Sequence, residues 1–300
     1  METKPIQKIT PFLWFDNQAE EAVNFYTSIF KNSSISTINR YSEAGADVAE
    51  MSKGSVMTVA FQIEGQDFVA LNGGPVFQIT PVISFFINCD TTQEIYRLWE
   101  KFSEGGKVMM ELDKYHFSER YGWIQDKFGV SWQLILQDRA QKIAPCFMFT
   151  GVQHKKAEEA IHFYLSIFEN SNILQLERYG PDLGPEGAIV HARFTLNGQE
   201  FVAMDSHESM SYNFSPAISF VVNCETQKEI DHYWDKLSEG GDESAQQCGW
   251  LQDKFGVSWQ IVPVALQEIL RKSDPEKSGR VMEAVLQMKK LDISVLKEVI

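Results

Sequence analysis

The chain has 300 residues, of which 44% are hydrophobic, and carries a formal net charge of −14 at pH 7. This length and composition are typical of a globular protein with about two domains, and the negative charge argues against nucleic acid as a partner because its phosphates would be repelled. No apolar run is long enough to span a bilayer and the first residues lack the layout of a signal peptide, so we expect a cytoplasmic protein with no membrane partner.

The two halves of the chain begin in the same way. Residues 9–15 (ITPFLWF) predict a short apolar strand and return as residues 143–149 (IAPCFMF). Residues 19–30 follow with apolar side chains at positions i, i+3, i+4 and i+7, which predicts an amphipathic helix, and residues 157–168 repeat them closely. The chain is therefore an internal duplication.

Each repeat continues with strands and then restarts its own pattern. In the first repeat three strands are expected at residues 35–40, 56–63 and 67–71, the last two joined by a hairpin turn at Gly65. The elements that follow are a strand, an amphipathic helix and two further strands, at residues 82–87, 95–102, 123–125 and 131–136. This order predicts an α+β fold made of paired βαβββ modules.

The duplication sets the expected domain boundaries. We expect domains at residues 9–136 and 143–262, followed by a helical C-terminal extension at residues 263–300. In that extension, Asp274-Pro275-Glu276 is typical of a helix start, and residues 292–300 suggest a second short helix. We interpret the extension as a packing or dimerisation element. The short linker between the repeats predicts an internal pseudo-dimer, and a homodimer of the whole chain is an open alternative.

Two motifs carry a resemblance to a known family. Ala-Glu-Glu-Ala-x-x-Phe-Tyr-x-Ser-Ile-Phe occurs at residues 19–30 and 157–168, and Asp-Lys-Phe-Gly-Val-Ser-Trp-Gln occurs at residues 126–133 and 253–260. In these motifs the chain resembles the PhnB-like branch of the vicinal oxygen chelate superfamily, which includes glyoxalase I, extradiol dioxygenases, and fosfomycin- and bleomycin-resistance proteins. The branch carries the label 3-demethylubiquinone-9 3-methyltransferase. The resemblance implies tandem domains of the glyoxalase/bleomycin-resistance fold.

The residues give the methyltransferase label little support. Binding of S-adenosylmethionine usually involves a glycine-rich loop between a strand and a helix. The glycine pairs Gly73-Gly74, Gly105-Gly106 and Gly240-Gly241 do not form such a loop. We therefore expect no S-adenosylmethionine and no other cofactor.

The resemblance also implies positions for a metal site. Metal-dependent members of the superfamily bind a divalent ion through His and Glu or Gln side chains of the sheets. The matching positions in this chain are Ile9, Asn72, Ser84, Gln133, Ile143, Asp205, Ser219 and Gln260. Because only Asp205 among them is a carboxylate, we predict that the metal site has been lost.

The two repeats differ most in the segment that lies between Gly106 and Gly122 in the first repeat. There the first repeat carries residues 107–121, a longer stretch than residues 242–248 of the second. We interpret residues 107–121 as a loop that can close over a ligand, with His116 and Glu119 as acid–base candidates. The alternative is a solvated connector. In the second repeat, His191 and Asp205 form a competing acid–base pair.

Further polar residues are candidates for binding a ligand. Arg40-Tyr41 and Arg178-Tyr179 precede a second pair of variable loops, residues 42–56 and 180–187, where an arginine can bind a carboxylate or pair with one for structure. Polar side chains on the predicted strands are expected to line a cup; those selected are Asn72, Gln133 and Gln260.

Three classes of function are consistent with these residues. The leading prediction is a small-molecule-binding protein of the resistance-protein type that has lost its metal ligands. The alternative is a glyoxalase- or isomerase-like enzyme that uses side-chain acid–base groups or an atypical metal site. The third is a duplicated protein whose role is to bind a protein partner.

Overall fold

The structure is a computed structural model that describes residues 6–41, 51–181, 184–266, 269 and 275–299. Part of the variable loop at residues 42–56, and Asp274 at the expected helix start, lie outside the described residues. Among the described residues, no helix is both long and apolar enough to cross a bilayer.

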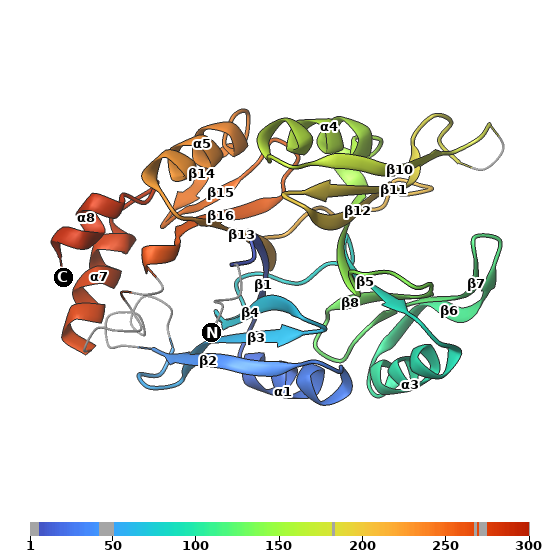
Figure 1. Cartoon of the computed structure of the whole chain (residues 1–300), viewed down its shortest axis with the longest axis horizontal. Coiled ribbons are helices and arrows are strands. Elements are labelled where there is room, and N and C mark those ends of the chain that lie inside the picture. The colour runs from blue at the N-terminus through green and yellow to red at the C-terminus, as the bar shows by residue number, and fades with distance from the viewer. Residues whose placement is uncertain (1–5, 42–50, 182–183, 267–268, 270–274, 300) are drawn as a thin grey trace. The chain divides into compact units, whose positions relative to one another are not determined.

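Four βαβββ modules follow one another along the chain (Figure 1). The first contains β1 (Ile9–Phe15), α1 (Ala19–Ile29), β2 (Ser34–Arg40), β3 (Val56–Ile63) and β4 (Gln66–Asn72). The second contains β5 (Ile83–Cys89), α3 (Thr92–Ser103), β6 (Lys107–Tyr115), β7 (Ser118–Gln125) and β8 (Ser131–Leu136).

The second repeat has the same order of elements. The third module contains β9 (Ile143–Phe149), the short helix η1 (Gly151–Gln153), α4 (Ala157–Ile167), β10 (Asn172–Arg178), β11 (Ile189–Leu196) and β12 (Gln199–Asp205). The fourth contains β13 (Ile218–Cys224), α5 (Gln227–Leu237), β14 (Asp242–Gln247), β15 (Trp250–Gln252) and β16 (Ser258–Pro263). Two helices follow as expected, α7 (Pro275–Leu286) and α8 (Ile293–Glu298).

The modules pair across the two repeats. One eight-stranded sheet, sheet A, has the order β14-β15-β16-β13-β1-β4-β3-β2, and the other, sheet B, has the order β10-β11-β12-β9-β5-β8-β7-β6. At their centres β1 runs antiparallel to β13, and β5 runs antiparallel to β9. Each sheet therefore takes one module from each repeat.

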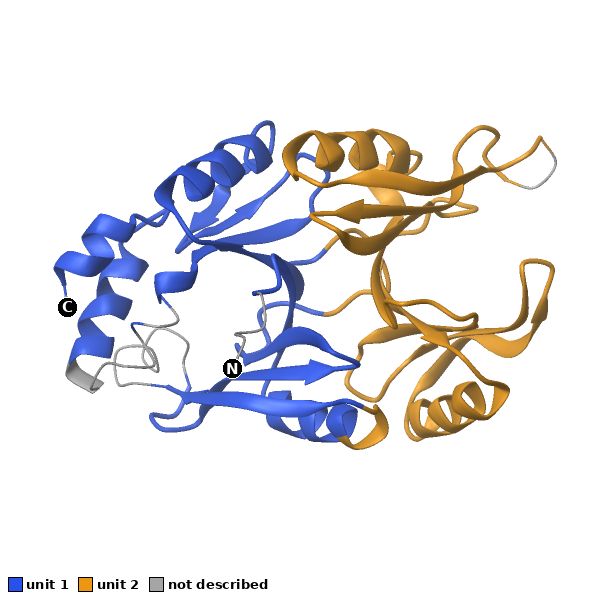
Figure 2. Cartoon of the chain, in the orientation of Figure 1, with its two compact units in different colours: residues 1–27, 32–78, 215–300 blue, residues 28–31, 79–214 orange. Residues whose placement is uncertain are grey.

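The compact units follow the sheets and not the repeats. Unit 1 comprises residues 1–27, 32–78 and 215–300, and unit 2 comprises residues 28–31 and 79–214 (Figure 2). The expected boundaries at 9–136 and 143–262 describe the sequence repeats, whereas each compact unit combines the first module of one repeat with the second module of the other. Modules of different repeats combine because the opening strand of each repeat pairs with the fifth strand of the other.

A buried aspartate explains one of the shared motifs. Asp126 accepts hydrogen bonds from the backbone N–H groups of Phe128 and Val130 and from Trp132 Nε1, the last at 2.8 Å. Asp253 makes the same three contacts in the second repeat, with Trp259 Nε1 at 2.8 Å. The motif therefore ties the turn before the last strand of a module to the tryptophan that packs under the helix.

The stretch at residues 107–121 is a β-hairpin and not the loop that we expected. β6 and β7 pair in antiparallel fashion with register shifts along the ladder. β6 is an edge strand of sheet B, where side chains are solvated, and its charged sequence therefore conceals the alternation of a strand.

Candidate functional site

The candidate site lies on the face of sheet B that α3 and α4 leave uncovered, which we call the open face. Side chains alternate between the two faces of a strand, and the register places Ser84 opposite Cys146 and Phe86 opposite Ala144 on this face. A buried apolar cluster occupies it, made of Phe86, Tyr121, Ile135, Ala144, Cys146 and Val202. Partly buried apolar side chains pack against the cluster, namely Met110, Tyr115, Trp123 and Met204.

A polar network lies inside this apolar cluster. Gln133 is 1% exposed; its Oε1 accepts a hydrogen bond from the Tyr121 hydroxyl at 2.5 Å, and its Nε2 donates to Ser84 Oγ at 2.8 Å. Burial raises the pKa of the Tyr121 hydroxyl and raises the pKa of the Cys146 thiol to about 12. Both groups are therefore protonated at neutral pH, and Cys146 is not an activated nucleophile.

Sheet A keeps only part of this network. Gln260 Nε2 donates to Ser219 Oγ at 3.0 Å, as Gln133 does to Ser84. The repeat places Phe12 where sheet B has Cys146, and Cys248 where it has Tyr121. The sheet A face therefore lacks the tyrosine hydroxyl that bonds Gln133 in sheet B.

The C-terminal helices also pack against the same face of sheet A. Leu266, Val281, Val285, Leu291 and Leu296 form a cluster against which Cys248 and Val262 pack. The backbone N–H of Cys248 donates to the carbonyl of Met288 at 2.7 Å. Because the described C-terminal helices occupy part of this face of sheet A, we take the open face of sheet B as the candidate site.

The positions matched to the superfamily's metal ligands do not converge. Ser84 and Gln133 share the open face, but Ile143 pairs with Ile87 on the helix-covered face. In the opening strand of the second repeat, Ala144 and Cys146 lie on the open face in place of Ile143. In sheet A, Thr10 and Phe12 lie on the corresponding face in place of Ile9.

Asn72 and Asp205 also lie on the helix-covered side. Asp205 accepts hydrogen bonds from the backbone N–H groups of Ala157 at 3.1 Å and Ile189 at 2.8 Å, and Asn72 Oδ1 accepts one from Ala19 at 2.8 Å. Both residues thus tie a strand end to a helix start. Among the described residues, no three His, Cys, Asp or Glu side chains gather to hold a metal ion. The donor set does not fit the superfamily's divalent ion.

His191 faces the apolar cluster from β11. Its ring centroid lies 6.0 Å from that of Phe86. Burial lowers the pKa of His191, and the nearby Arg193 and Arg139 lower it further, whereas Glu177 and Glu200 act in the opposite direction. The imidazole is therefore neutral at pH 7 and can accept a proton. Asp205 is not its partner, since the two side chains lie on opposite faces of the sheet.

His116 and Glu119, the acid–base candidates of the first repeat, belong to the same compact unit as His191. His116 is exposed near the tip of the β6–β7 hairpin, with its ring 5.1 Å from that of Phe117. Glu119 is exposed and pairs with Lys114 Nζ at 2.7 Å, and this hydrogen bond lowers the pKa of the Glu119 carboxyl. The structure therefore separates His116 and Glu119 from the buried network, although their hairpin belongs to the same sheet as His191.

The predicted arginine–tyrosine pairs contact the chain itself. Arg178 forms an ion pair with Glu158, and Arg40 Nη1 donates to the carbonyl of Gly54 at 3.1 Å. The hydroxyl of Tyr41 donates to the carbonyl of Asn72, and that of Tyr179 donates to the carbonyl of Asp205. These contacts tie the loops to the end of the sheet.

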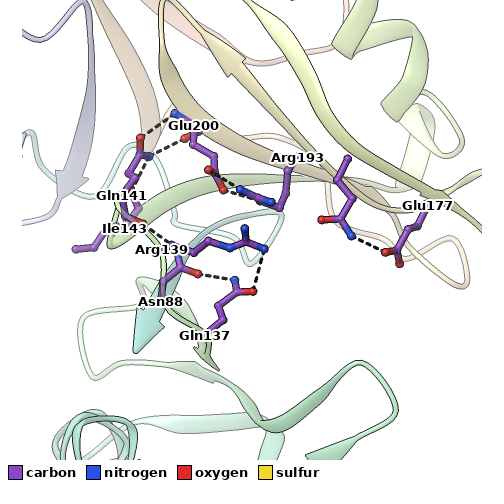
Figure 3. Close-up of polar contacts among 9 residues, drawn as sticks. Asn88, Gln137, Arg139, Gln141, Ile143, Glu177, Arg193 and Glu200 are labelled. Atoms are coloured by element: carbon purple, nitrogen blue, oxygen red, sulfur yellow. Dashed lines mark hydrogen bonds and ion pairs between the residues drawn. The ribbon is translucent and has the colours of Figure 1, made fainter. Parts of the chain in front are cut away.

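A charged cluster adjoins the apolar cluster, and sequence reasoning missed it (Figure 3). Arg193 and Glu200 form a two-pronged ion pair, at 2.7 Å and 2.8 Å. Arg139 Nη2 donates to Gln137 Oε1 at 3.4 Å, and Gln137 Nε2 donates to Asn88 Oδ1 at 2.6 Å. Because Arg139 lies in the polar linker between the repeats, no periodicity or motif distinguished it.

The family assignment follows from comparison with known proteins. The family model described as 3-demethylubiquinone-9 3-methyltransferase matches residues 7–135 and 141–262. The chain belongs to this family. The PhnB-like resemblance and the vicinal oxygen chelate fold predicted from the motifs are confirmed.

Solved structures of two kinds are similar to the chain. A PhnB protein from Bacillus cereus is 42% identical, covering 43% of this chain and 99% of its own, with a TM-score of 0.40. A protein from Staphylococcus aureus is 36% identical over 45% of this chain and 100% of its own, with a TM-score of 0.19. Glyoxalase I from Zea mays is 13% identical over 88% of this chain and 97% of its own, with a TM-score of 0.56, which shows a shared fold. Comparison with curated proteins gave no match.

The family's label implies a methyl donor, and the strand-to-helix turns do not fit one. Thr91 and Thr226 cap α3 and α5 by accepting hydrogen bonds from the N–H groups of Glu94 and Glu229. At α1 and α4, Asn72 and Asp205 accept from the first helical N–H groups. These N–H groups, which a bound phosphate or carboxylate would need, are already used. We derive no methyl-transfer step.

Proposed function

We propose that the open face of sheet B binds a small organic molecule with an apolar body, without a metal ion. The observation that carries this proposal is the set of partly buried apolar side chains, Met110, Tyr115, Trp123 and Met204, packed around a buried polar network. Ligand sites are typically apolar surfaces with a few fixed polar groups. Resistance proteins of the superfamily that the motifs resemble offer a functional analogy.

The neutral fluorophore N-phenyl-1-naphthylamine tests this proposal. We expect its emission to rise on binding, and Met204→Arg to weaken binding about tenfold or more, or ~1.4 kcal/mol, because the new charge replaces an apolar contact. Leu71→Arg is the matched control, since Leu71 holds the equivalent, partly buried position in sheet A. Equal effects of the two changes, or no binding by the unaltered protein, would contradict the proposal.

A second candidate is an isomerase- or glyoxalase-like enzyme, and His191 is the observation that favours it. A neutral imidazole beside an apolar wall can remove a proton from a carbon next to a carbonyl group. We would incubate the protein with hydroxyacetone in D₂O and follow exchange of the carbon-bound protons by NMR. Exchange that is lost in His191→Gln, while the naphthylamine still binds, supports the enzyme; exchange at the rate of the buffer alone contradicts it.

We place the protein in the cytoplasm. Its four cysteines, Cys89, Cys146, Cys224 and Cys248, are all free thiols, the state that a reducing compartment maintains. Fractionation of cells that express the chain, followed by immunoblotting, tests this assignment, and recovery in a secreted fraction would contradict it.

A further inference from the structure

Arg139 is the one cation of the cluster in Figure 3 that forms no ion pair there, since Arg193 pairs with Glu200. Its Nε is buried and makes no hydrogen bond, and its guanidinium makes one long hydrogen bond among the described residues, from Nη2 to Gln137 at 3.4 Å. A guanidinium has five N–H donors. Leaving a buried donor and a cation unpaired costs free energy, so the arrangement is suited to receive an acceptor.

The other arginine of the cluster is already paired. Arg193 and Glu200 neutralise each other with side chains 12% and 14% exposed. Glu177 accepts a hydrogen bond from Gln175 at 2.6 Å, on the far side of Arg193 from Arg139 in Figure 3. His191 is neutral, since burial lowers its pKa. Arg139 is therefore the cation of this cluster that no carboxylate pairs with among the described residues.

The charged cluster continues the apolar cluster along the same face. Gln137 lies two positions after Ile135, Asn88 two after Phe86, and Glu200 two before Val202. An interval of two positions keeps side chains on one face of a strand. Apolar side chains thus fill the middle of the open face, and polar ones follow at one end. A ligand that lies along the strands would meet both.

We infer that the open face of sheet B binds an amphiphilic carboxylic acid whose carboxylate pairs with the Nε and Nη groups of Arg139. This inference rests on the proposed small-molecule site and names its ligand class. A guanidinium matches a carboxylate in a planar, two-pronged geometry. A carboxylate is favoured over a phosphate because a single arginine lacks an ion pair within the described part of the chain, and the nearby carboxylate of Glu177, which has no ion pair there either, would repel a second negative charge.

Competition between matched compounds and N-phenyl-1-naphthylamine tests the inference. 2-Naphthoate and 2-naphthamide share one apolar body and differ in charge. We expect the naphthoate to bind at least about tenfold more tightly at low salt, and we expect Arg139→Gln to remove this preference while leaving the naphthamide unaffected. Arg40→Gln makes the same change in net charge in unit 1 and should keep the preference. Arg139→Lys should retain part of it, because it keeps the charge but loses the planar geometry.

The outcomes separate this inference from the proposed function. Binding of the naphthylamine with equal affinities for naphthoate and naphthamide would overturn the carboxylate anchor and leave the apolar site standing. No binding of any of the three compounds would overturn the proposed site itself. Tighter binding of 2-naphthyl phosphate than of 2-naphthoate, lost in Arg139→Gln, would overturn the choice of a carboxylate.

Discussion

The Gln133→Leu substitution measures how much the buried network of sheet B contributes to stability. Gln133 is 1% exposed, and its amide joins the Tyr121 hydroxyl to Ser84 Oγ. Leucine cannot form either hydrogen bond. The Tyr121 hydroxyl and the Ser84 hydroxyl would then remain buried without this partner.

The expected cost follows from the two orphaned groups. A buried polar group left without its partner costs about 1–3 kcal/mol, so Gln133→Leu should lower the free energy of unfolding by about 2–6 kcal/mol. Gln260 is the matched control in sheet A, where it donates to Ser219 and has no equivalent of Tyr121. Gln260→Leu should therefore cost about 1–3 kcal/mol.

Urea denaturation followed by circular dichroism gives the comparison. The double variant Tyr121→Phe/Gln133→Leu should recover about 1–3 kcal/mol relative to Gln133→Leu alone, because the orphaned hydroxyl is removed. If Gln133→Leu and Gln260→Leu prove equally destabilising, and if Tyr121→Phe recovers nothing, the tyrosine does not contribute to the network as described.

Three further predictions concern pH, the repeated turn and the C-terminal helices. The pKa of His191 is lowered from 6.5 in the folded state, so the unfolded chain binds the proton first as pH falls. The free energy of unfolding should therefore decrease as pH drops below about 6.5 and become constant below the folded pKa. His191→Gln should flatten this part of the plot of unfolding free energy against pH. Asp126→Asn and Asp253→Asn should each cost about 1–3 kcal/mol of unfolding free energy in urea, since an amide NH₂ would face N–H donors; a cost confined to one repeat would contradict the shared role. Leu291→Ala, at a residue 1% exposed, should cost about 2–5 kcal/mol and increase hydrogen exchange in α7 and α8; unchanged exchange there would contradict the packing.

Local sequence patterns predicted the helices and strands because alternation and helical periodicity depend on residues close together in the sequence. The βαβββ order and the C-terminal helices were predicted in this way, and the fold is confirmed. The exchange of modules between repeats was not predicted. The apolar strand at 9–15 can pair equally well, by pattern alone, with the strand at 82–87 of its own repeat or with residues 218–224 of the other. Which pairing forms depends on contacts distant in sequence.

The site was predicted less well because the face of a strand changes with each residue. Gln133 and Gln260 lie on the open faces as expected, whereas Asp205 lies one residue from the open-face position of Met204 and belongs to the opposite side. His191 and Asp205 therefore cannot act as the pair that the sequence suggested. Arg139 stands in a linker, where no alternation exists to indicate which way a side chain points.

The exchange of modules changes where asymmetry between the repeats has its effect. Tyr121 and Arg139 come from the first repeat and its linker, and Cys146 and His191 come from the second, yet all four belong to unit 2. Unit 1 receives the remaining modules and the C-terminal helices, which pack against its sheet at Cys248 and Val262. Substitutions in both repeats can therefore combine on one open face while the other is covered by an extension. A candidate site therefore belongs to a sheet and not to a repeat. The polar network and the arginine without an ion pair favour sheet B.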